Sequence, residues 1–311
     1  MPWTRIFSGI IAIALAFAMI WAGSWYFTAG FMAIVLLGQL EYFRMVRAKG
    51  IEPAGKTTLV LSQVLLIIAT VIPNLTDAVF PISGTMICFY LLFQPKLATI
   101  ADISTSILGL FYGGWLPSYW IRLRVGLETQ NSVLVAANSV TTNSATEPLI
   151  HFPLEANVSL PIINFNFTTI SPALAITLLA FGCIWAADIG AYLVGKYFGR
   201  TRLSQISPKK TVEGAVFGIL GSILVATIGA FFLHWNAWPL SGILLGSLIG
   251  VASLLGDLTE SMMKRDAGVK DSGQIIPGHG GILDRTDSYV FTAPLVYYFV
   301  TLILPILPPS L

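Results

Sequence analysis

The chain has 311 residues, of which 55% are hydrophobic and only 10% are charged, and its mean hydropathy is +0.79. Soluble domains carry about 25% charged residues, so the composition excludes an ordinary soluble protein and predicts an integral membrane protein with several spans. The net charge of +2 gives no reason to expect nucleic acid as a partner. The two cysteines, Cys88 and Cys183, both lie in apolar runs, which leaves no disulfide framework and no zinc site.

The apolar runs predict an all-α protein that crosses the membrane about nine times, since one helical span needs about 20 mainly apolar residues. In chain order, the candidate spans are roughly 6–23, 25–43, 58–74, 78–94, 98–120, 170–194, 215–233, 240–258 and 289–307. The first run could be taken for a signal peptide. No clear small-residue cleavage site precedes the second run, so we interpret the first as a span.

Positive charge predicts the orientation, because cytoplasmic loops are enriched in Lys and Arg. With the N-terminus in the cytoplasm, all of the 17 lysines and arginines except Arg122 and Arg124 fall on the cytoplasmic side. Nine spans then place the C-terminus outside. We divide the chain into an amino-terminal membrane region (1–124), a polar exterior loop or small cap (125–168) and a carboxy-terminal catalytic membrane region (169–311).

Polar residues gather at 261–287, between the last two apolar spans. If the preceding helix continues into this stretch, Asp257, Ser261 and Lys264 share one face at i, i+4 and i+7. A carboxylate there suits a hard cation such as Mg²⁺, and the lysine suits a phosphate. The simpler alternative is that Asp257 only forms an ion pair with Lys264 or Lys210 at the helix end.

A glycine-rich turn and two further carboxylates follow in the same stretch. Three glycines surround His279, and their backbone N–H groups can face an anion. Asp284 can bring a second carboxylate to a metal, and Arg285 can hold a phosphate through two hydrogen bonds. Asp287 could bind the metal or orient Arg285, or it could simply cap the last span.

The loop after the sixth span holds a second group of polar residues. Lys209 and Lys210 could attract anionic lipid, or they could clamp the phosphates of a nucleotide or a lipid. Ser207 and Thr211 flank the two lysines. Glu213 fits the N-terminus of the next helix, beside that clamp.

Two acids lie within the apolar runs themselves. Asp188, near the end of the sixth span, should not lie in hydrocarbon without a task, and we expect a role near the metal or the nucleotide in preference to a pair with Lys196. Asp102, in the fifth span, has no assigned role. One interpretation is that it simply marks an interruption of the helix. The sequence contains no P-loop motif, which excludes a nucleotide site of the P-loop kind.

At these residues the chain resembles the phosphatidate cytidylyltransferases, also called CDP-diacylglycerol synthases. The stretch 261–287 reads S-x-x-K-R-x4-K-D-x-G-x2-I-P-x-H-G-G-x-x-D-R-x-D, with no departure from the family signature at its defining positions. Residues 188–192 and 207–214 resemble a second block of the family, although Ile189 stands where a hydroxyl residue is usual. The resemblance is good over roughly 170–300 and only general in the amino-terminal half.

This resemblance implies transfer of a cytidylyl group from CTP to phosphatidic acid, which gives CDP-diacylglycerol and pyrophosphate. Because the attacking lipid phosphate is already anionic, catalysis would need mainly positioning and charge neutralisation. The resemblance also implies a metal centre of Mg²⁺, with K⁺ as an optional second ion, held by Asp257 and Asp284. We further expect an active site at the cytoplasmic face of a bacterial plasma (inner) membrane, and the family suggests a homodimer.

The expected site residues fall into two groups. The expected catalytic residues are Asp257, Lys264, Asp284 and Asp287. The expected substrate-binding residues are Asp188, Ser207, Lys209, Lys210, Thr211, Glu213, Ser261, Arg265, Lys270, Asp271, His279 and Arg285. Of these two groups, the resemblance implies phosphate contacts for Lys264, Arg265, Lys270 and Arg285.

Two other functions stay open. A transporter or channel could use Asp102, Asp188, Asp257 and Glu260 as a path through the bilayer, although the charges gather in two cytoplasmic loops and are sparse across the membrane depth. A relative that uses CTP on another lipid is the closer alternative, such as a polyprenol or phytol kinase or an enzyme for ether-linked lipid phosphates. Such a relative would not be expected to carry the whole 261–287 pattern.

Overall fold

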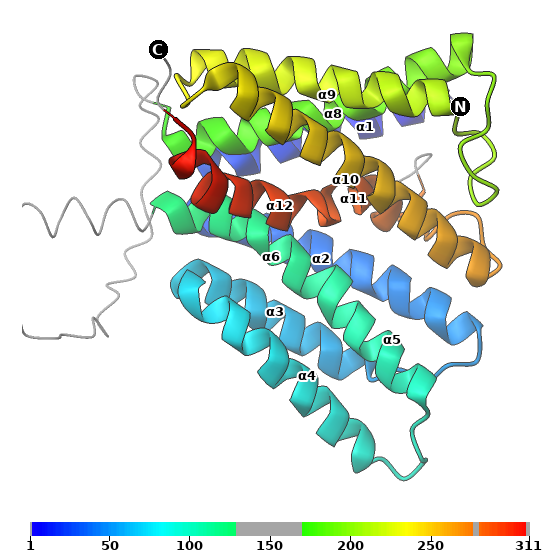
Figure 1. The fold of residues 1–311 in the computed structure, drawn as a ribbon. Helices are drawn as coiled ribbons and strands as arrows, with labels where there is room; N and C mark the ends of the chain where they lie inside the picture. Colours follow the sequence, from blue (N-terminus) through cyan, green and yellow to red (C-terminus); the bar gives the residue numbers. More distant parts are fainter. Residues whose placement is uncertain (1, 129–169, 276–279, 309–311) are drawn as a thin grey trace, which may run out of the picture.

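The structure is a computed structural model that describes residues 2–128, 170–275 and 280–308, with side chains from residue 9 onward (Figure 1). Within these ranges the chain forms helices joined by short connections, without a β-sheet. An isolated antiparallel bridge joins Arg202 and Thr211. Nearly all of the predicted exterior segment, from residue 129 on, lies outside the described residues.

The described part of the amino-terminal half consists of separate helices and one long continuous helical run. The separate helices are α1 (Pro2–Ala22), α2 (Ser24–Ala48), α3 (Gly55–Val71), η1 (Pro73–Leu75) and α4 (Thr76–Leu92). The continuous run comprises α5 (Ile100–Leu110), η2 (Phe111–Trp115), α6 (Leu116–Ile121) and η3 (Arg122–Gly126). η2 and η3 are π-helical turns, which widen a helix locally and are frequent near functional sites.

The carboxy-terminal half contains three long helices and a final run of shorter ones. The long helices are α8 (Pro172–Phe198), α9 (Val212–Phe232) and α10 (Trp238–Asp266). The final run comprises α11 (Leu283–Val290), α12 (Thr292–Tyr298), η4 (Phe299–Ile303) and η5 (Leu304–Ile306). Each of the predicted spans therefore coincides with a helical segment.

Six helical segments of the described chain are long and apolar enough to cross a membrane: Ser24–Ala48, Pro73–Leu92, Pro172–Phe198, Val212–Phe232, Trp238–Asp266 and Leu283–Ile306. Two more apolar helices, Gly9–Ala22 and Gly55–Val71, are shorter. These findings confirm the prediction of an all-α polytopic membrane protein. The number of nine spans and the sides on which the termini lie stay predictions.

Helix ends fall into two groups at opposite ends of the bundle (Figure 1). The connections α2–α3, α4–α5, α8–α9 and α10–α11 lie at one end, together with the start of α1. The connections α1–α2, α3–α4 and α9–α10 lie at the other end, together with η5. Because the first end carries the loops that hold nearly all lysines and arginines, we call it the basic end.

Glycines on α10 allow it to pack closely against α9. Gly242, Gly246 and Gly250 follow at i, i+4 and i+8, and a Cβ atom on any of them would meet atoms of α9. At Gly246 that atom would run into the backbone of Ile223. Small residues let helices approach closely in a membrane, where lipid offers no hydrophobic drive for helix association. This packing fixes α10, which carries much of the polar site described below.

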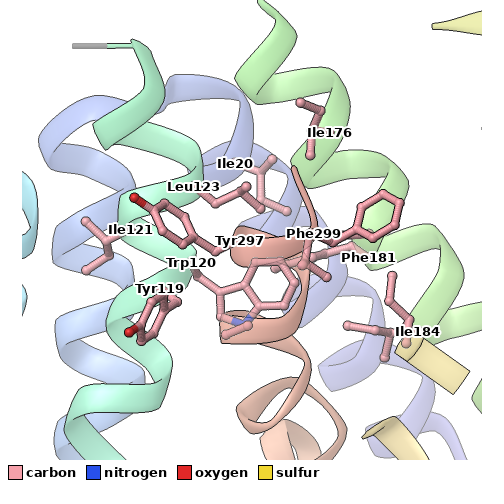
Figure 2. Packing of buried hydrophobic residues seen from close by; sticks show 14 of the residues in the cluster. Ile20, Tyr119, Trp120, Ile121, Leu123, Ile176, Phe181, Ile184, Tyr297 and Phe299 are labelled. Atoms are coloured by element: carbon pink, nitrogen blue, oxygen red, sulfur yellow. The ribbon is translucent and has the colours of Figure 1, made fainter. Parts of the chain in front are cut away.

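The main apolar core is centred on Trp120 and joins α6 to the carboxy-terminal helices (Figure 2). The Trp120 ring meets Phe181 of α8 edge-on, with 4.8 Å between the centroids. Its indole N–H donates a hydrogen bond to the backbone carbonyl of Tyr289, on α11, at 3.0 Å. Because a buried indole N–H needs such a partner, this bond helps to fix α11 against α6.

Three charged residues that stood apart in the sequence have structural roles. Arg122 forms an ion pair with Asp77 at 2.8 Å, and the guanidinium of buried Arg124 donates to the carbonyl of Ile20 at 2.8 Å. These arginines thus join helices at the end of the bundle opposite the basic end. Asp102 completes a capping box at the start of α5, so its charge serves the helix end.

Candidate functional site

A polar cavity of ≈ 630 Å³ lies between α8, α9, α10 and α11, towards the basic end of the bundle. Its volume is within the range of about 300–1,000 Å³ that is typical of small-molecule sites. The cavity is lined by most of the predicted site residues: Asp188, Ser207, Lys209, Lys210, Thr211, Asp257, Asp284, Arg285 and Asp287. The fold therefore brings the two polar stretches of the sequence together.

Three carboxylates converge beside this cavity. Oxygen atoms of Asp257 and Glu260 on α10, and of Asp287 on α11, lie within 4.8 Å of one another. Glu260 is fully buried, and its Oε1 atom has no hydrogen-bond partner among the described residues. Carboxylates this close repel one another unless a proton or a cation offsets their charge, and an all-oxygen donor set could hold Mg²⁺. We call these three residues the carboxylate cluster; Glu260 was not among the predicted site residues.

Lys264 links the carboxylate cluster to Asp284. Its Nζ atom donates to Glu260 at 2.9 Å and to Asp284 at 2.6 Å. The other oxygen of Asp284 accepts hydrogen bonds from the backbone N–H groups of Ser272, at 3.0 Å, and Gly281, at 2.8 Å. Asp284 is therefore held by a lysine and by the turn before α11, next to the cluster, and its predicted role as a metal ligand stays a prediction.

Lys210 reaches the cluster from a short hairpin between α8 and α9. Backbone hydrogen bonds from Leu203 to Lys210 and from Val212 to Thr201, both of 2.9 Å, close this hairpin. Lys210 forms an ion pair with Asp257, as the simpler alternative for that acid had anticipated. Because the same lysine also lines the polar cavity, the pair lies inside the site.

Asp188 connects α8 to both helices of the cluster. Its Oδ1 atom accepts hydrogen bonds from the hydroxyl groups of Ser253 on α10, at 3.2 Å, and Ser288 on α11, at 3.3 Å. Lys196 lines the same polar cavity, but its ammonium group lies 5.4 Å from the ring centroid of Tyr197. Asp188 therefore lines the polar cavity and bonds to two serines, and its expected role near the metal or the nucleotide stays a prediction.

Comparison with known proteins gives the family. Residues 3–303 match a family model described as the cytidylyltransferase family. The phosphatidate cytidylyltransferase of Synechocystis sp. is 62% identical over 308 residues, which cover 99% of this chain and 99% of that protein. The chain belongs to the cytidylyltransferase family. The resemblance predicted from the signature is thereby confirmed.

More distant relatives carry the same activity in their names. Phosphatidate cytidylyltransferase 4, chloroplastic, of Arabidopsis thaliana is 39% identical over 289 residues, or 90% of this chain and 68% of that protein. A phosphatidate cytidylyltransferase of Staphylococcus epidermidis is 48% identical over 135 residues, or 42% of this chain and 51% of that protein. The similarity therefore covers most of this chain for the Arabidopsis protein but less than half of it for the Staphylococcus protein.

Two predicted substrate-binding residues instead contact the backbone of the α8–α9 connection. The exposed carboxylate of Glu213 accepts hydrogen bonds from the N–H groups of Arg200 and Thr201, both at 3.1 Å. The Arg265 side chain donates to the carbonyl of Ile206 at 3.4 Å. Both residues hold the hairpin that carries Lys210, so their predicted direct contacts with substrate stay predictions.

The remaining predicted residues lie around the site or outside the described chain. Ser261 donates to Asp257 at 3.4 Å, as its helical spacing predicted. Lys270 and Asp271 are exposed and do not line the polar cavity. His279 lies outside the described residues.

Sequence reasoning missed Glu41, a fully buried acid on α2. Its carboxylate accepts hydrogen bonds from the Ser272 hydroxyl at 3.0 Å and from the N–H groups of Ile282, at 3.1 Å, and Leu283, at 3.0 Å. A Cβ atom on Gly281 would collide with this carboxylate, so a glycine leaves room for it. A signal was available, because an acid inside an apolar run is costly unless it has partners.

Proposed function

We propose that this protein transfers a cytidylyl group from CTP to phosphatidate, giving CDP-diacylglycerol and pyrophosphate for membrane phospholipid synthesis. One observation carries the proposal: the two blocks that resemble the family signature form one polar cavity, with the carboxylate cluster, Lys210 and Lys264 at its wall. The 62% identity to a phosphatidate cytidylyltransferase over nearly the whole chain supports the same activity.

The proposed chemistry depends on charge neutralisation between two phosphate-bearing substrates. Asp257, with Glu260, Asp287 and the predicted Asp284 as further oxygen donors, would hold Mg²⁺, which would supply positive charge to offset that of the phosphates; K⁺ is proposed as a second ion. Lys210 and the Lys264 ammonium supply positive charge next to the same carboxylates. The lipid phosphate is already a nucleophile, so the chain needs to position it and has little proton transfer to perform.

We propose that all nine helical segments cross the membrane, with the N-terminus in the cytoplasm and the C-terminus outside. The collection of basic loops at one end of the bundle supports this orientation. The polar cavity would then open to the cytoplasmic face of a bacterial plasma membrane, where CTP is available.

We also propose a homodimer, which light scattering of the purified protein in detergent would test.

Cysteine labelling tests the orientation. In a variant that lacks Cys88 and Cys183, a cysteine at Gln205 in the α8–α9 connection should resist membrane-impermeant thiol reagents in intact cells. A cysteine at Asn236, in the α9–α10 connection, should react with the same reagents. The reverse pattern would invert the proposed topology.

The transporter alternative is less well supported. Asp102 is engaged in a capping box, and Asp188, Asp257 and Glu260 gather around one cavity and its cluster. They do not form a series of acids through the membrane depth. Sites for transport are built from ionisable residues along a path, and this arrangement instead resembles a reaction site.

An assay with purified protein in detergent tests the proposed function. With Mg²⁺, phosphatidate and CTP labelled at the α-phosphate, we expect labelled CDP-diacylglycerol, and Asp257→Asn should abolish it. Asp266→Asn, an exposed acid on the same helix, is the control. In a parallel assay with CTP labelled at the γ-phosphate, transfer of label to a lipid alcohol would establish the kinase alternative. Equal product without metal, or in Asp257→Asn, would overturn the proposed site.

A further inference from the structure

A second, apolar cavity of ≈ 490 Å³ lies beside the polar one. It is enclosed by residues of α1, α2, α6, α8 and α11, with Ala16, Val35, Trp120 and Phe181 among its lining side chains. Its size falls in the range of about 300–1,000 Å³ that is usual for ligand sites. None of the charged residues that form the carboxylate cluster lines it.

Helix α11 separates the two cavities. Asp284, Asp287 and Ser288, at i, i+3 and i+4, line the polar cavity, whereas Thr286, Tyr289 and Val290 line the apolar cavity. These two sets lie on opposite faces of one amphipathic helix. Arg285 lines both cavities, so a cation stands where the apolar space meets the polar site.

The apolar cavity reaches the exposed apolar surface of the bundle at α1. Ile13 and Leu15 line this cavity, yet they are 56% and 67% exposed. Side chains that line a cavity and are also exposed mark its mouth. A mouth framed by apolar residues of a membrane helix admits a hydrocarbon chain from the bilayer and not a soluble nucleotide.

We infer that the cavity between α1, α2 and α11 holds one acyl chain of the phosphatidate substrate, with Arg285 at the lipid phosphate. This inference rests on the proposed function and adds the site of the lipid substrate. An anionic phosphate with an apolar tail matches the cation at the junction and the apolar space behind it. The phosphate then lies at the edge of the polar cavity that contains Asp284 and Asp287.

The cavity would act by positioning the substrate and contribute little to its affinity. Burial of an acyl chain from water is favourable, but a chain in the bilayer is already in hydrocarbon. What the cavity supplies is a fixed place for the chain, which holds the attached phosphate near the reacting groups. Filling the cavity should therefore harm substrates with long chains and spare those with short ones.

Ala16→Phe tests this by placing a ring in the cavity, and Ala18→Phe is the matched control, because Ala18 is exposed on α1 and does not line the cavity. For dipalmitoyl phosphatidate, we expect Ala16→Phe to lower kcat/KM at least about tenfold, since a single misfitting group in an apolar pocket has effects of that order. Activity with dihexanoyl phosphatidate, and KM for CTP, should change less than about twofold. Ala18→Phe should resemble the parent with both lipids.

Equal losses with both lipids, no loss with either, or equal losses in both variants would overturn the inference. Photolabelling keeps the test independent of turnover: phosphatidate with a diazirine on one acyl chain should label residues 12–19 or 31–38 in the parent and much less in Ala16→Phe. Equal labelling by a phosphatidylcholine with the same diazirine would show a general lipid site and also overturn it. If the parent makes no CDP-diacylglycerol from either lipid, the proposed function fails, whereas the photolabelling still decides the cavity.

Discussion

The Glu41 carboxylate accepts a hydrogen bond from the Ser272 hydroxyl at 3.0 Å, across 231 positions of the chain. The same carboxylate accepts from the N–H groups of Ile282 and Leu283 at the start of α11. One acid of the amino-terminal half therefore holds the turn from which the site residues of α11 project. Glu41 is a positioning residue in this arrangement, since it lines neither cavity.

Glu41→Gln should disorder this turn while leaving the bundle folded. The amide cannot accept all three hydrogen bonds, and a buried donor left without a partner costs about 1–3 kcal/mol. We expect hydrogen exchange at Ile282 and Leu283 to accelerate, and kcat/KM to fall about tenfold or more, because about 1.4 kcal/mol corresponds to a factor of ten. Exchange in α8 and α9 should not change.

Glu52→Gln is the control for this prediction, since Glu52 is an exposed acid whose ion pair with Lys96 lies on the surface. It should leave exchange and activity within about twofold of the parent, because exposed ion pairs contribute little. If Glu41→Gln instead accelerates exchange throughout the bundle, the residue supports the whole fold and does not specifically position the turn.

Lys264→Met should remove activity and stability together. Lys264 neutralises buried Glu260 and half-buried Asp284, and removing one partner of a buried charge network costs about 3–5 kcal/mol. We expect a large decrease of the thermal unfolding midpoint and a loss of cytidylyltransferase activity of at least about a hundredfold. Activity that survives in a destabilised protein would show that Lys264 serves only the fold.

Lys49→Met is a matched control for that experiment. Lys49 forms an ion pair with Asp266 at 2.6 Å, but both side chains are exposed, so the pair should contribute less than about 1 kcal/mol. The unfolding midpoint and the activity should therefore stay near those of the parent. A loss as large as that in Lys264→Met would indicate that charge at the basic end matters in general.

The sequence predicted those parts of the site that depend on local helical spacing. Asp257, Ser261 and Lys264 lie on one face of α10 as the periodicity required, and Ser261 contacts Asp257. The capping role of Asp102 was also readable in principle, because Thr99-x-x-Asp102 has the spacing of a capping box. A local pattern suffices for such features, since their partners are three or four residues apart.

Contacts between distant helices could not be read in the same way. The link from Glu41 to α11 joins the amino-terminal half to the last span, and no periodicity connects them. Glu260 lies three residues after Asp257 on α10, but its approach to Asp287 depends on how α10 packs against α11. The predicted metal pair of Asp257 and Asp284 drew on the signature, which does not specify the distances between its residues.

Metal dependence should identify the ligands. Removal of divalent cations with EDTA should abolish activity, and Mg²⁺ should restore it. Glu260→Gln and Asp287→Asn should raise the Mg²⁺ concentration for half-maximal activity at least about tenfold, because each removes one charged oxygen ligand from a hard cation. An unchanged Mg²⁺ requirement in both variants would place the ion away from the carboxylate cluster.

Asp284→Asn separates two roles for the acid that the signature assigned to the metal. If Asp284 is a ligand, as predicted, the Mg²⁺ requirement should rise as it does for Asp287→Asn. If it acts only by holding Lys264, to which it is paired at 2.6 Å, kcat should fall with an unchanged Mg²⁺ requirement. Measuring rate against Mg²⁺ concentration for both variants distinguishes these outcomes.

Gly246→Ala should destabilise the bundle, whereas Gly84→Ala should not. A Cβ atom at Gly246 would collide with the backbone of Ile223 on α9, while at Gly84, on α4, it would meet only the end of the Ile107 side chain at 3.5 Å. Within a helix, alanine is otherwise favoured over glycine by roughly 0.5–1 kcal/mol. We therefore expect the thermal unfolding midpoint to fall in Gly246→Ala and to stay level or rise in Gly84→Ala. Equal midpoints in the two variants would mean that α9 and α10 can separate without cost, and that their close approach does not fix the site on α10.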